Sequence, residues 1–281
     1  MGVAQKYLVV HADDAGLCAS ENKATIAGLQ SGLITSYSMM VPCPGFQEIA
    51  DFTLQNPQYD YGVHLTLTCE WRDYKFGPVL PTKEVPSLVD TNGHFFKNRT
   101  LLKEHAQPEE AYKELKTQIT TVFDLGMHPS HLDAHMFSIG ASPALFDVYL
   151  QLGSEFNLPV LLNNRLLEMV GLPFDEKLQR KKGYLDTVYF ADFSHFEAGH
   201  LNEFYWKTLD ELNPGISMFL IHPAFNNEEM QQITVDHPNF GSEWRQMDFE
   251  TFSAEKTKQK QSPSSIGATN QLFLRRAGVC Q

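Results

Sequence analysis

The chain has 281 residues, of which 42% are hydrophobic and 20% are charged, as in folded globular proteins. Its formal net charge is −12 and no run of Lys and Arg interrupts its body, so neither nucleic acid nor an anionic membrane is expected as a partner. The sequence shows no signal segment, no membrane-length apolar run and no cysteines at metal-site spacing, so we expect a cytoplasmic protein with free thiols.

Two adjacent carboxylates, Asp13 and Asp14, follow the first apolar run. Carboxylates side by side at a strand end are costly unless a cation, a shared proton or several donors neutralise them. Three later apolar runs also end in residue types that bind metals. These runs end at His64, at His131 with His135, and at His222. We therefore expect four distant stretches to meet around one divalent metal ion.

Strands and helices alternate along the chain. Strands are predicted at residues 6–10, 33–41, 61–66, 131–135, 158–162, 184–190 and 216–221. Helices are predicted at residues 20–31, 45–55, 108–125, 142–153 and 197–212. Six or seven β/α units predict an α/β protein, namely a distorted, TIM-barrel-like (β/α) barrel of about seven strands. The alternative is an open doubly wound sheet, and both folds bring the carboxyl ends of the strands together.

Two segments depart from this alternation. Residues 70–107 contain several aromatic residues among prolines and an Asn-Gly pair, which favours an ordered lid insertion. Residues 255–281 are linker-like and are expected to be a disordered tail. We therefore expect residues 1–254 to form a single catalytic barrel domain.

The polar residues at the predicted strand ends suit metal-assisted hydrolysis. One carboxylate and two imidazoles can hold a divalent ion with open positions for water and substrate. A further carboxylate can act as a base, and a further histidine as an acid. Each residue type also has an ordinary structural role: Asp as a helix cap, His64 as a core histidine, and His222 as a turn residue before Pro223. Of His131 and His135, we expect at most one to bind metal directly, namely His135, and His131 to take a supporting or substrate-binding role.

Five motifs in order carry a family resemblance over roughly residues 6–252. They are His11-Ala12-Asp13-Asp14-Ala15-Gly16-Leu17, Gly32-Leu33-Ile34-Thr35-Ser36, Gly62-Val63-His64-Leu65-Thr66-Leu67-Thr68, Pro129-Ser130-His131-Leu132-Asp133-Ala134-His135 and Ile221-His222-Pro223-Ala224. With these motifs the chain resembles the YdjC-like carbohydrate deacetylases. The resemblance implies a distorted barrel and a metal-dependent enzyme that removes acetyl groups from N-acetylglucosamine units of small sugars such as chitooligosaccharides.

The resemblance also implies roles for individual residues. Asp14, His64 and His135 match the metal ligands, Asp13 the base and His222 the acid. The implied ion is Mg²⁺, with Zn²⁺, Mn²⁺ and Co²⁺ as alternatives. Two positions depart from the family pattern, because His11 and Ala15 stand where the family usually has Asn and Phe.

Contacts to the sugar are expected from Trp71 on the insertion, from His131 and from Arg165. Two other functions stay open. The chain could be a metal-dependent phosphoesterase acting on a phosphosugar, which would use similar ligands. It could also be a catalytically impaired sugar-binding protein, an interpretation that His11 and Ala15 keep open. Whether the chain forms a homodimer is likewise open.

Overall fold

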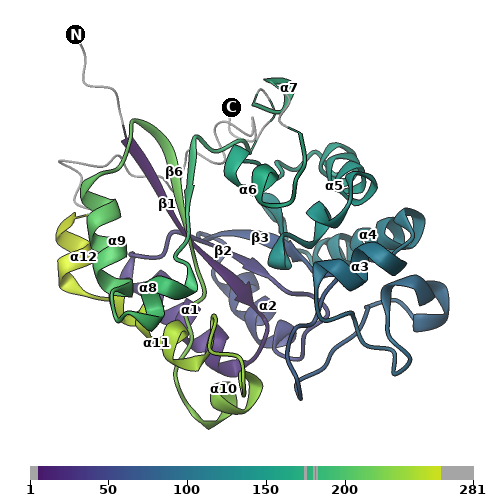
Figure 1. Ribbon diagram of the computed structural model, residues 1–281, viewed down its shortest axis with the longest axis horizontal. Helices are drawn as coiled ribbons and strands as arrows, with labels where there is room; N and C mark the ends of the chain where they lie inside the picture. The colour runs from purple at the N-terminus through teal and green to yellow at the C-terminus, as the bar shows by residue number, and fades with distance from the viewer. Residues whose placement is uncertain (1–5, 174–175, 180, 182, 261–281) are drawn as a thin grey trace.

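A single parallel sheet forms the centre of the computed structural model, which describes residues 6–173, 176–179, 181 and 183–260 (Figure 1). Its strand order is β4-β3-β2-β1-β6-β5, and each neighbouring pair is parallel. The strands are β1 (Lys6–Ala15), β2 (Ser36–Met39), β3 (Asp60–Leu65), β4 (His131–Ala134), β5 (Thr187–Tyr189) and β6 (Gly215–Ile221). On one side of β1, the strands β2, β3 and β4 follow one another in chain order. On the other side lie β6 and then β5, and the six strands form a half-barrel.

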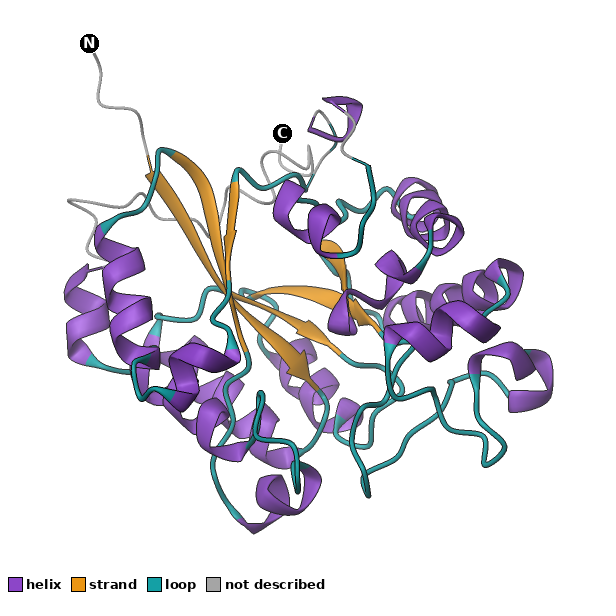
Figure 2. Ribbon diagram, in the orientation of Figure 1, coloured by secondary structure: helices purple, strands orange, loops and turns teal. Residues whose placement is uncertain are grey.

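Helices cover the outside of this half-barrel (Figure 2). The longer ones are α1 (Ala19–Ser31), α2 (Phe46–Gln55), α4 (Pro108–Asp124), α5 (Pro143–Glu155), α9 (Leu201–Asp210) and α11 (Ser242–Thr251). The shorter ones are α3 (Arg99–His105), α6 (Asn164–Met169), α7 (Glu176–Gln179), α8 (Phe193–Glu197), α10 (Glu228–Ile233) and α12 (Glu255–Lys260). Three 3₁₀ turns complete the described elements: η1 (Thr82–Glu84), η2 (Pro86–Leu88) and η3 (His135–Ala141).

The predicted α/β class is confirmed, whereas a barrel of about seven strands is not. The regular strand expected at residues 158–162 is wrong, because this segment makes only isolated bridges, from Val160 to Leu132 and from Leu162 to Tyr184. Pro159 has no N–H to donate, which limits regular pairing here. The helix expected at residues 197–212 is α9, which begins at Leu201 and ends at Asp210, whereas Glu197 belongs to the separate helix α8.

The insertion at residues 70–107 is ordered and packs against α4. The buried carboxylate of Glu114 on α4 accepts hydrogen bonds from the backbone N–H groups of Val79 (2.9 Å) and Leu80 (3.0 Å). At its base, the Cys69 N–H donates to the Phe96 carbonyl at 2.9 Å. The insertion is therefore fixed to the body of the protein at both of its sides.

The expected disordered tail is corrected for its first residues. Residues Glu255–Lys260 form helix α12, and Thr257 on this helix is buried and accepts a hydrogen bond from the indole of Trp206 at 3.1 Å. A polar sequence forms this helix because it packs on α9. Residues 261–281 lie outside the described part of the chain, as does Cys280. The remaining cysteines, Cys18, Cys43 and Cys69, are free and buried. Within the described residues, no helix combines the length and the apolar character needed to cross a bilayer.

Candidate active site

A bulge at the end of β1 places both Asp13 and Asp14 at the site. Between Ala12 and Ala15 the strand spans three steps while β2 spans two, from Tyr37 to Met39. The extra residue breaks the alternation that would send adjacent side chains to opposite faces. Asp14 adopts φ = 63°, a left-handed conformation that is uncommon for a side-chain-bearing residue. This local strain re-aims the carboxylate of Asp14.

Asp14, His64 and His135 meet at the carboxyl ends of β1, β3 and β4. His135 Nδ1 lies 2.9 Å from Asp14 Oδ1, and His64 Nε2 lies 3.3 Å from the same oxygen. Their potential ligand atoms all lie within 4.8 Å of one another, and all three residues are buried. The three side chains assigned as ligands by resemblance therefore do converge.

Each of the two imidazoles is held by a second carboxylate. His64 Nδ1 lies 2.9 Å from Asp133 Oδ1, and His135 Nε2 lies 2.9 Å from Glu70 Oε2. An ionised carboxylate only accepts, so each of these ring nitrogens donates an N–H to its outer carboxylate, and the other nitrogen of the ring faces Asp14. Carboxylate–histidine pairs of this kind are the usual support of metal-bound histidines.

Arg245 anchors the other oxygen of Asp14. Its guanidinium donates to Asp14 Oδ2 at 2.8 Å and to Glu21 Oε2 at 2.7 Å, and all three side chains are buried. Burial alone would raise the pKa of Asp14, but His135 and Arg245 outweigh it and hold that pKa well below its ordinary value. Asp14 is therefore ionised, with Oδ1 left to face the two imidazoles.

This donor set fits a divalent ion. One carboxylate oxygen and two imidazole nitrogens suit Zn²⁺, Mn²⁺ and similar ions, and leave coordination positions for other ligands. Burial lowers the pKa of His135, but Glu70 and Asp14 outweigh this and raise it to about 9. A coordinating imidazole is neutral, so uptake of an ion would displace the proton from His135 Nδ1, the nitrogen that faces Asp14.

Asp13 and His222 form the second part of the site. His222 Nε2 lies 3.8 Å from Asp13 Oδ2, while Asp13 Oδ1 and His222 Nδ1 are buried without hydrogen-bond partners among the described residues. Burial raises the pKa of Asp13 to about 6, although His64 and His11 oppose it. Burial lowers the pKa of His222 to about 3, so its imidazole is neutral at pH 7. Unpaired atoms and shifted pKa values suit groups that exchange protons.

These groups open into a pocket of about 300 Å³, at the lower end of the range for small-molecule sites. The site residues make up the polar part of its lining. The apolar part includes Leu161, Leu166, Met169, Phe190 and Leu220. Arg99, from helix α3 of the insertion, also lines the pocket. Its Nη1 is buried without a hydrogen-bond partner among the described residues, and burial lowers its pKa.

The three residues expected to contact the sugar lie outside the described lining of this pocket. Trp71 is fully buried beneath the guanidinium of Arg245, 5.4 Å from its ring centre. His131 is 1% exposed and lies below the site. Arg165 stacks on the ring of Phe190 at 4.0 Å. In this structure Arg165 therefore packs on Phe190, which lines the pocket, and Trp71 packs under Arg245.

Four residues that make or support the site are not found from sequence: Glu70, Asp133, Arg245 and Asp248. Asp248 supports His222, whose backbone N–H donates to Asp248 Oδ2 at 2.9 Å. Asp133 has a signal, since it alternates with His131 and His135 along a predicted strand and so shares their face. Glu70 has no such signal, because it is the first residue of the irregular insertion at residues 70–107 and lies beyond the predicted strand. Arg245 and Asp248 belong to α11, and the local pattern gives no sign that they are buried.

Several known proteins are similar to this chain. Two similar proteins are named carbohydrate deacetylase: one from Thermoanaerobacter pseudethanolicus is 27% identical over 83% of this chain and 86% of its own length, and one from Brevibacillus brevis is 29% identical over 79% and 82%. A crystal structure of an Enterococcus faecalis protein named for cellobiose-phosphate cleavage is 25% identical, with a TM-score of 0.79 over 96% of this chain and 99% of that one. The profile of the YdjC-like protein family matches residues 7–262, and the chain belongs to this family.

Proposed function

We propose that this protein is a metal-dependent hydrolase that cleaves the acetamide C–N bond of N-acetylglucosamine units in small oligosaccharides such as chitooligosaccharides. The observation that carries the proposal is the convergence of Asp14, His64 and His135 beside Asp13 and His222 in one pocket. The relatives named carbohydrate deacetylase support the substrate class. Mg²⁺ is the ion proposed from the family resemblance, with Zn²⁺, Mn²⁺ and Co²⁺ as alternatives.

Asp14, His64 and His135 would hold the ion, and the residues around them would keep these three ligands oriented. A bound divalent ion supplies Lewis-acid polarisation of a carbonyl and makes water more acidic. Asp14 would offer Oδ1, because Arg245 occupies Oδ2. The carboxylates of Asp133 and Glu70 keep the protons of His64 and His135 on the nitrogens that face away from Asp14.

Asp13 and His222 would move the proton. With a pKa of about 6, Asp13 is mostly ionised at pH 7 and accepts a proton from the attacking water. The departing amine must then be protonated. We assign this step to His222 from its position, because its Nε2 lies 3.8 Å from Asp13 Oδ2 and its side chain lines the same pocket. Phe240, whose ring centre lies 4.6 Å from that of His222, shields this exchange from one side.

Acetate release tests the proposal directly. The purified protein is treated with a chelator, reloaded separately with Mg²⁺, Mn²⁺, Co²⁺ or Zn²⁺, and incubated with N,N′-diacetylchitobiose. We expect no acetate after chelation and one acetate per cleaved acetamide after reloading. Binding of the sugar without acetate release under any ion would favour the alternative of a catalytically impaired sugar-binding protein.

A phosphorylated sugar is the second candidate substrate, because of Arg99. A buried guanidinium atom without a partner is costly, and a phosphate group on the ligand would satisfy it. The similar Enterococcus faecalis protein is named for cleavage of a sugar phosphate. We therefore include phosphorylated N,N′-diacetylchitobiose in the assay and measure both products. Acetate would identify a deacetylase that accepts phosphosugars, and inorganic phosphate would identify a phosphoesterase.

A further inference from the structure

A polar row lies beneath the candidate metal site, and the mechanism above does not use all of it. It crosses four adjacent strands, with His11 on β1, Ser36 and Ser38 on β2, His64 on β3 and Asp133 on β4. Their exposures are 3% or less. Buried polar groups are tolerated only where they are paired, so the contacts within this row decide its stability and its geometry.

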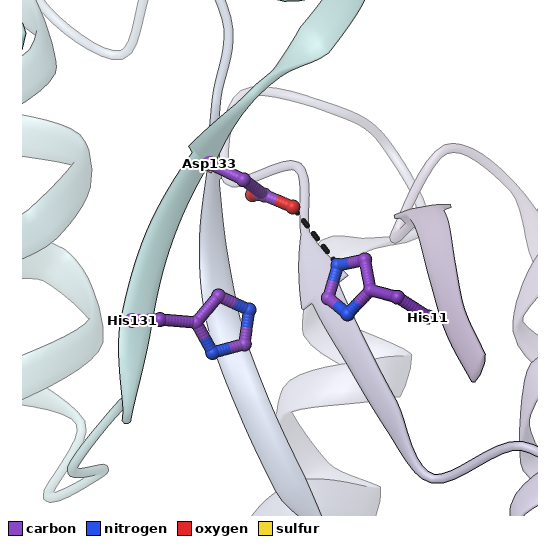
Figure 3. Close-up of side chains that lie close together, drawn as sticks. All are labelled: His11, His131 and Asp133. Carbon is purple, nitrogen blue, oxygen red and sulfur yellow. Dashed lines mark hydrogen bonds and ion pairs between the residues drawn. The ribbon is translucent and has the colours of Figure 1, made fainter. Parts of the chain in front are cut away.

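Both ring nitrogens of His11 have partners. Nδ1 lies 2.9 Å from Ser36 Oγ, and Nε2 lies 2.9 Å from Asp133 Oδ2. Figure 3 shows the imidazole projecting from β1 toward the carboxylate on β4, with the ring of His131 beside it. The two ring centres are 5.1 Å apart and the ring planes meet at 66°. Because the carboxylate accepts, the proton on this side sits on His11 Nε2. The ring is thus fixed in one orientation.

Asp133 connects His11 to the metal ligand His64 by hydrogen bonds. While Oδ2 accepts from His11 and from the Ser38 hydroxyl (2.7 Å), Oδ1 accepts from His64 Nδ1 at 2.9 Å. His11, Asp133 and His64 therefore form one continuous chain of hydrogen bonds. Its far end is His64 Nε2, the atom that faces Asp14 Oδ1.

The same nitrogen of His11 also faces the candidate base. His11 Nε2 lies 3.4 Å from Asp13 Oδ1, and that oxygen has no hydrogen-bond partner among the residues the structure describes. The same nitrogen thus hydrogen-bonds the carboxylate that orients a metal ligand and makes a longer charge contact with the carboxylate placed to accept a proton. An apolar residue at position 11 would leave both carboxylates without it.

We propose that His11 is a positioning residue, which holds His64 in its metal-binding orientation through Asp133 and fixes the direction of the Asp13 carboxylate through the same Nε2–H. This inference rests on the proposed function for its catalytic part, but its effect on metal binding can be measured separately. A second interpretation of the same cluster, a second metal ion held by His11, His131 and Asp133, is an outcome that the test distinguishes.

The test replaces the imidazole with and without a donor. His11→Leu removes the donor, and His11→Met is used in its place if that variant does not fold, because its flexible side chain fills irregular space. His11→Gln keeps an N–H group near the position of Nε2. Thr53→Val is the control, since it removes a different buried hydroxyl, hydrogen-bonded to Tyr37 at 2.7 Å, away from the site.

Zn²⁺ and Mn²⁺ affinities are measured by calorimetry on the chelator-treated protein, and kcat and KM by acetate release. We expect His11→Leu to weaken metal binding and to lower kcat by about 10- to 100-fold each, with KM unchanged. His11→Gln should recover most of both losses, and Thr53→Val should lower only the thermal stability.

Two results would overturn the proposal. One is a folded His11→Leu protein with wild-type metal affinity and kcat. The other is a wild-type protein that binds two ions, of which His11→Leu loses one, because this would make His11 a ligand. A wild-type protein that binds metal but releases no acetate would refute the proposed function instead, and the comparison of affinities would still decide the role of His11.

Discussion

The two halves of the site differ in how their polar atoms are satisfied. On the metal side, His64 and His135 each use one ring nitrogen on an outer carboxylate, and Asp14 uses one oxygen on Arg245. On the acid–base side, Asp13 Oδ1 and His222 Nδ1 are buried and lack hydrogen-bond partners among the described residues. The two sides also differ in exposure, because the side chains of Asp13 and His222 are 12% and 16% exposed, against 1–3% for Asp14, His64 and His135.

This contrast distinguishes residues that hold the ion from residues that transfer protons. A ligand to an ion must keep its direction, so every atom that does not face the ion is tied to a neighbour. A proton-transfer group needs a free valence and a shifted pKa, which incomplete pairing and burial together provide. Substitutions on the two sides should therefore fail differently: metal-side variants should lose the ion, and acid–base variants should keep it.

The largest effect is expected for His135→Ala. This variant removes one of the two imidazoles, so the protein should lose its ion and its acetate release should fall by about 10⁴-fold or more, since the Lewis-acid contribution amounts to several kcal/mol. Elemental analysis of the dialysed protein measures the ion. Full metal content in the variant would remove His135 from the ligand set.

Asp13→Asn should act on the other side of the site. The amide has the shape of the carboxylate but cannot accept the proton, so acetate release should drop by about 10²–10⁴-fold. Metal content should match that of the wild type, measured on the same preparation. If this variant kept full activity, Asp13 would not be the base, and if it lost the ion, the separation between the two sides would be wrong.

Glu70→Gln should give an intermediate effect on metal binding. The new amide would still contact His135 but would no longer fix its tautomer as a carboxylate does, so metal affinity should weaken by about 10- to 100-fold. Calorimetric titration with Zn²⁺ measures this. Glu84→Gln, an exposed change on the same insertion, is the matched control and should leave affinity unchanged. Equal affinities in the two variants would make Glu70 a packing residue only.

The smallest effect is expected for Asp248→Asn. It concerns the free energy of unfolding and should depend on pH. Burial raises the pKa of Asp248 from 3.8 to about 7, while its two oxygens accept from the Tyr205 hydroxyl and from the backbone N–H of His222. Because the folded-state pKa is the higher one, ionising Asp248 costs stability, and this cost grows as the pH rises from 3.8 to about 7.

The amide in the Asp248→Asn variant cannot ionise, so this variant should gain stability relative to the wild type as the pH rises. Urea unfolding at pH 5 and pH 8 measures the difference. A stability difference that is the same at both pH values would show that Asp248 does not titrate in this range.

The sequence predicts those parts of the site that depend on strand periodicity. Asp14, His64 and His135 follow apolar runs that form parallel strands, so their convergence follows from the fold class. The bulge that turns both Asp13 and Asp14 into the site involves a single extra residue and has no periodic signal.

The supporting residues could not be predicted, because they come from irregular or distant segments. Arg245 meets Asp14 across 231 positions of the chain, on a helix whose sequence looks largely polar. Trp71 is expected on the pocket wall but is fully buried, since the insertion folds back against the body of the protein. The expected strand at residues 158–162 contains Pro159, whose missing N–H reduces the segment to isolated bridges.

The central claim is that one ion binds between Asp14, His64 and His135. Crystals of the protein grown with Mn²⁺ or Co²⁺, with diffraction recorded at the absorption edge of that metal, test it most directly. We expect one anomalous peak within coordination distance of Asp14 Oδ1, His64 Nε2 and His135 Nδ1. A peak at other residues, or none at saturating metal, would contradict it.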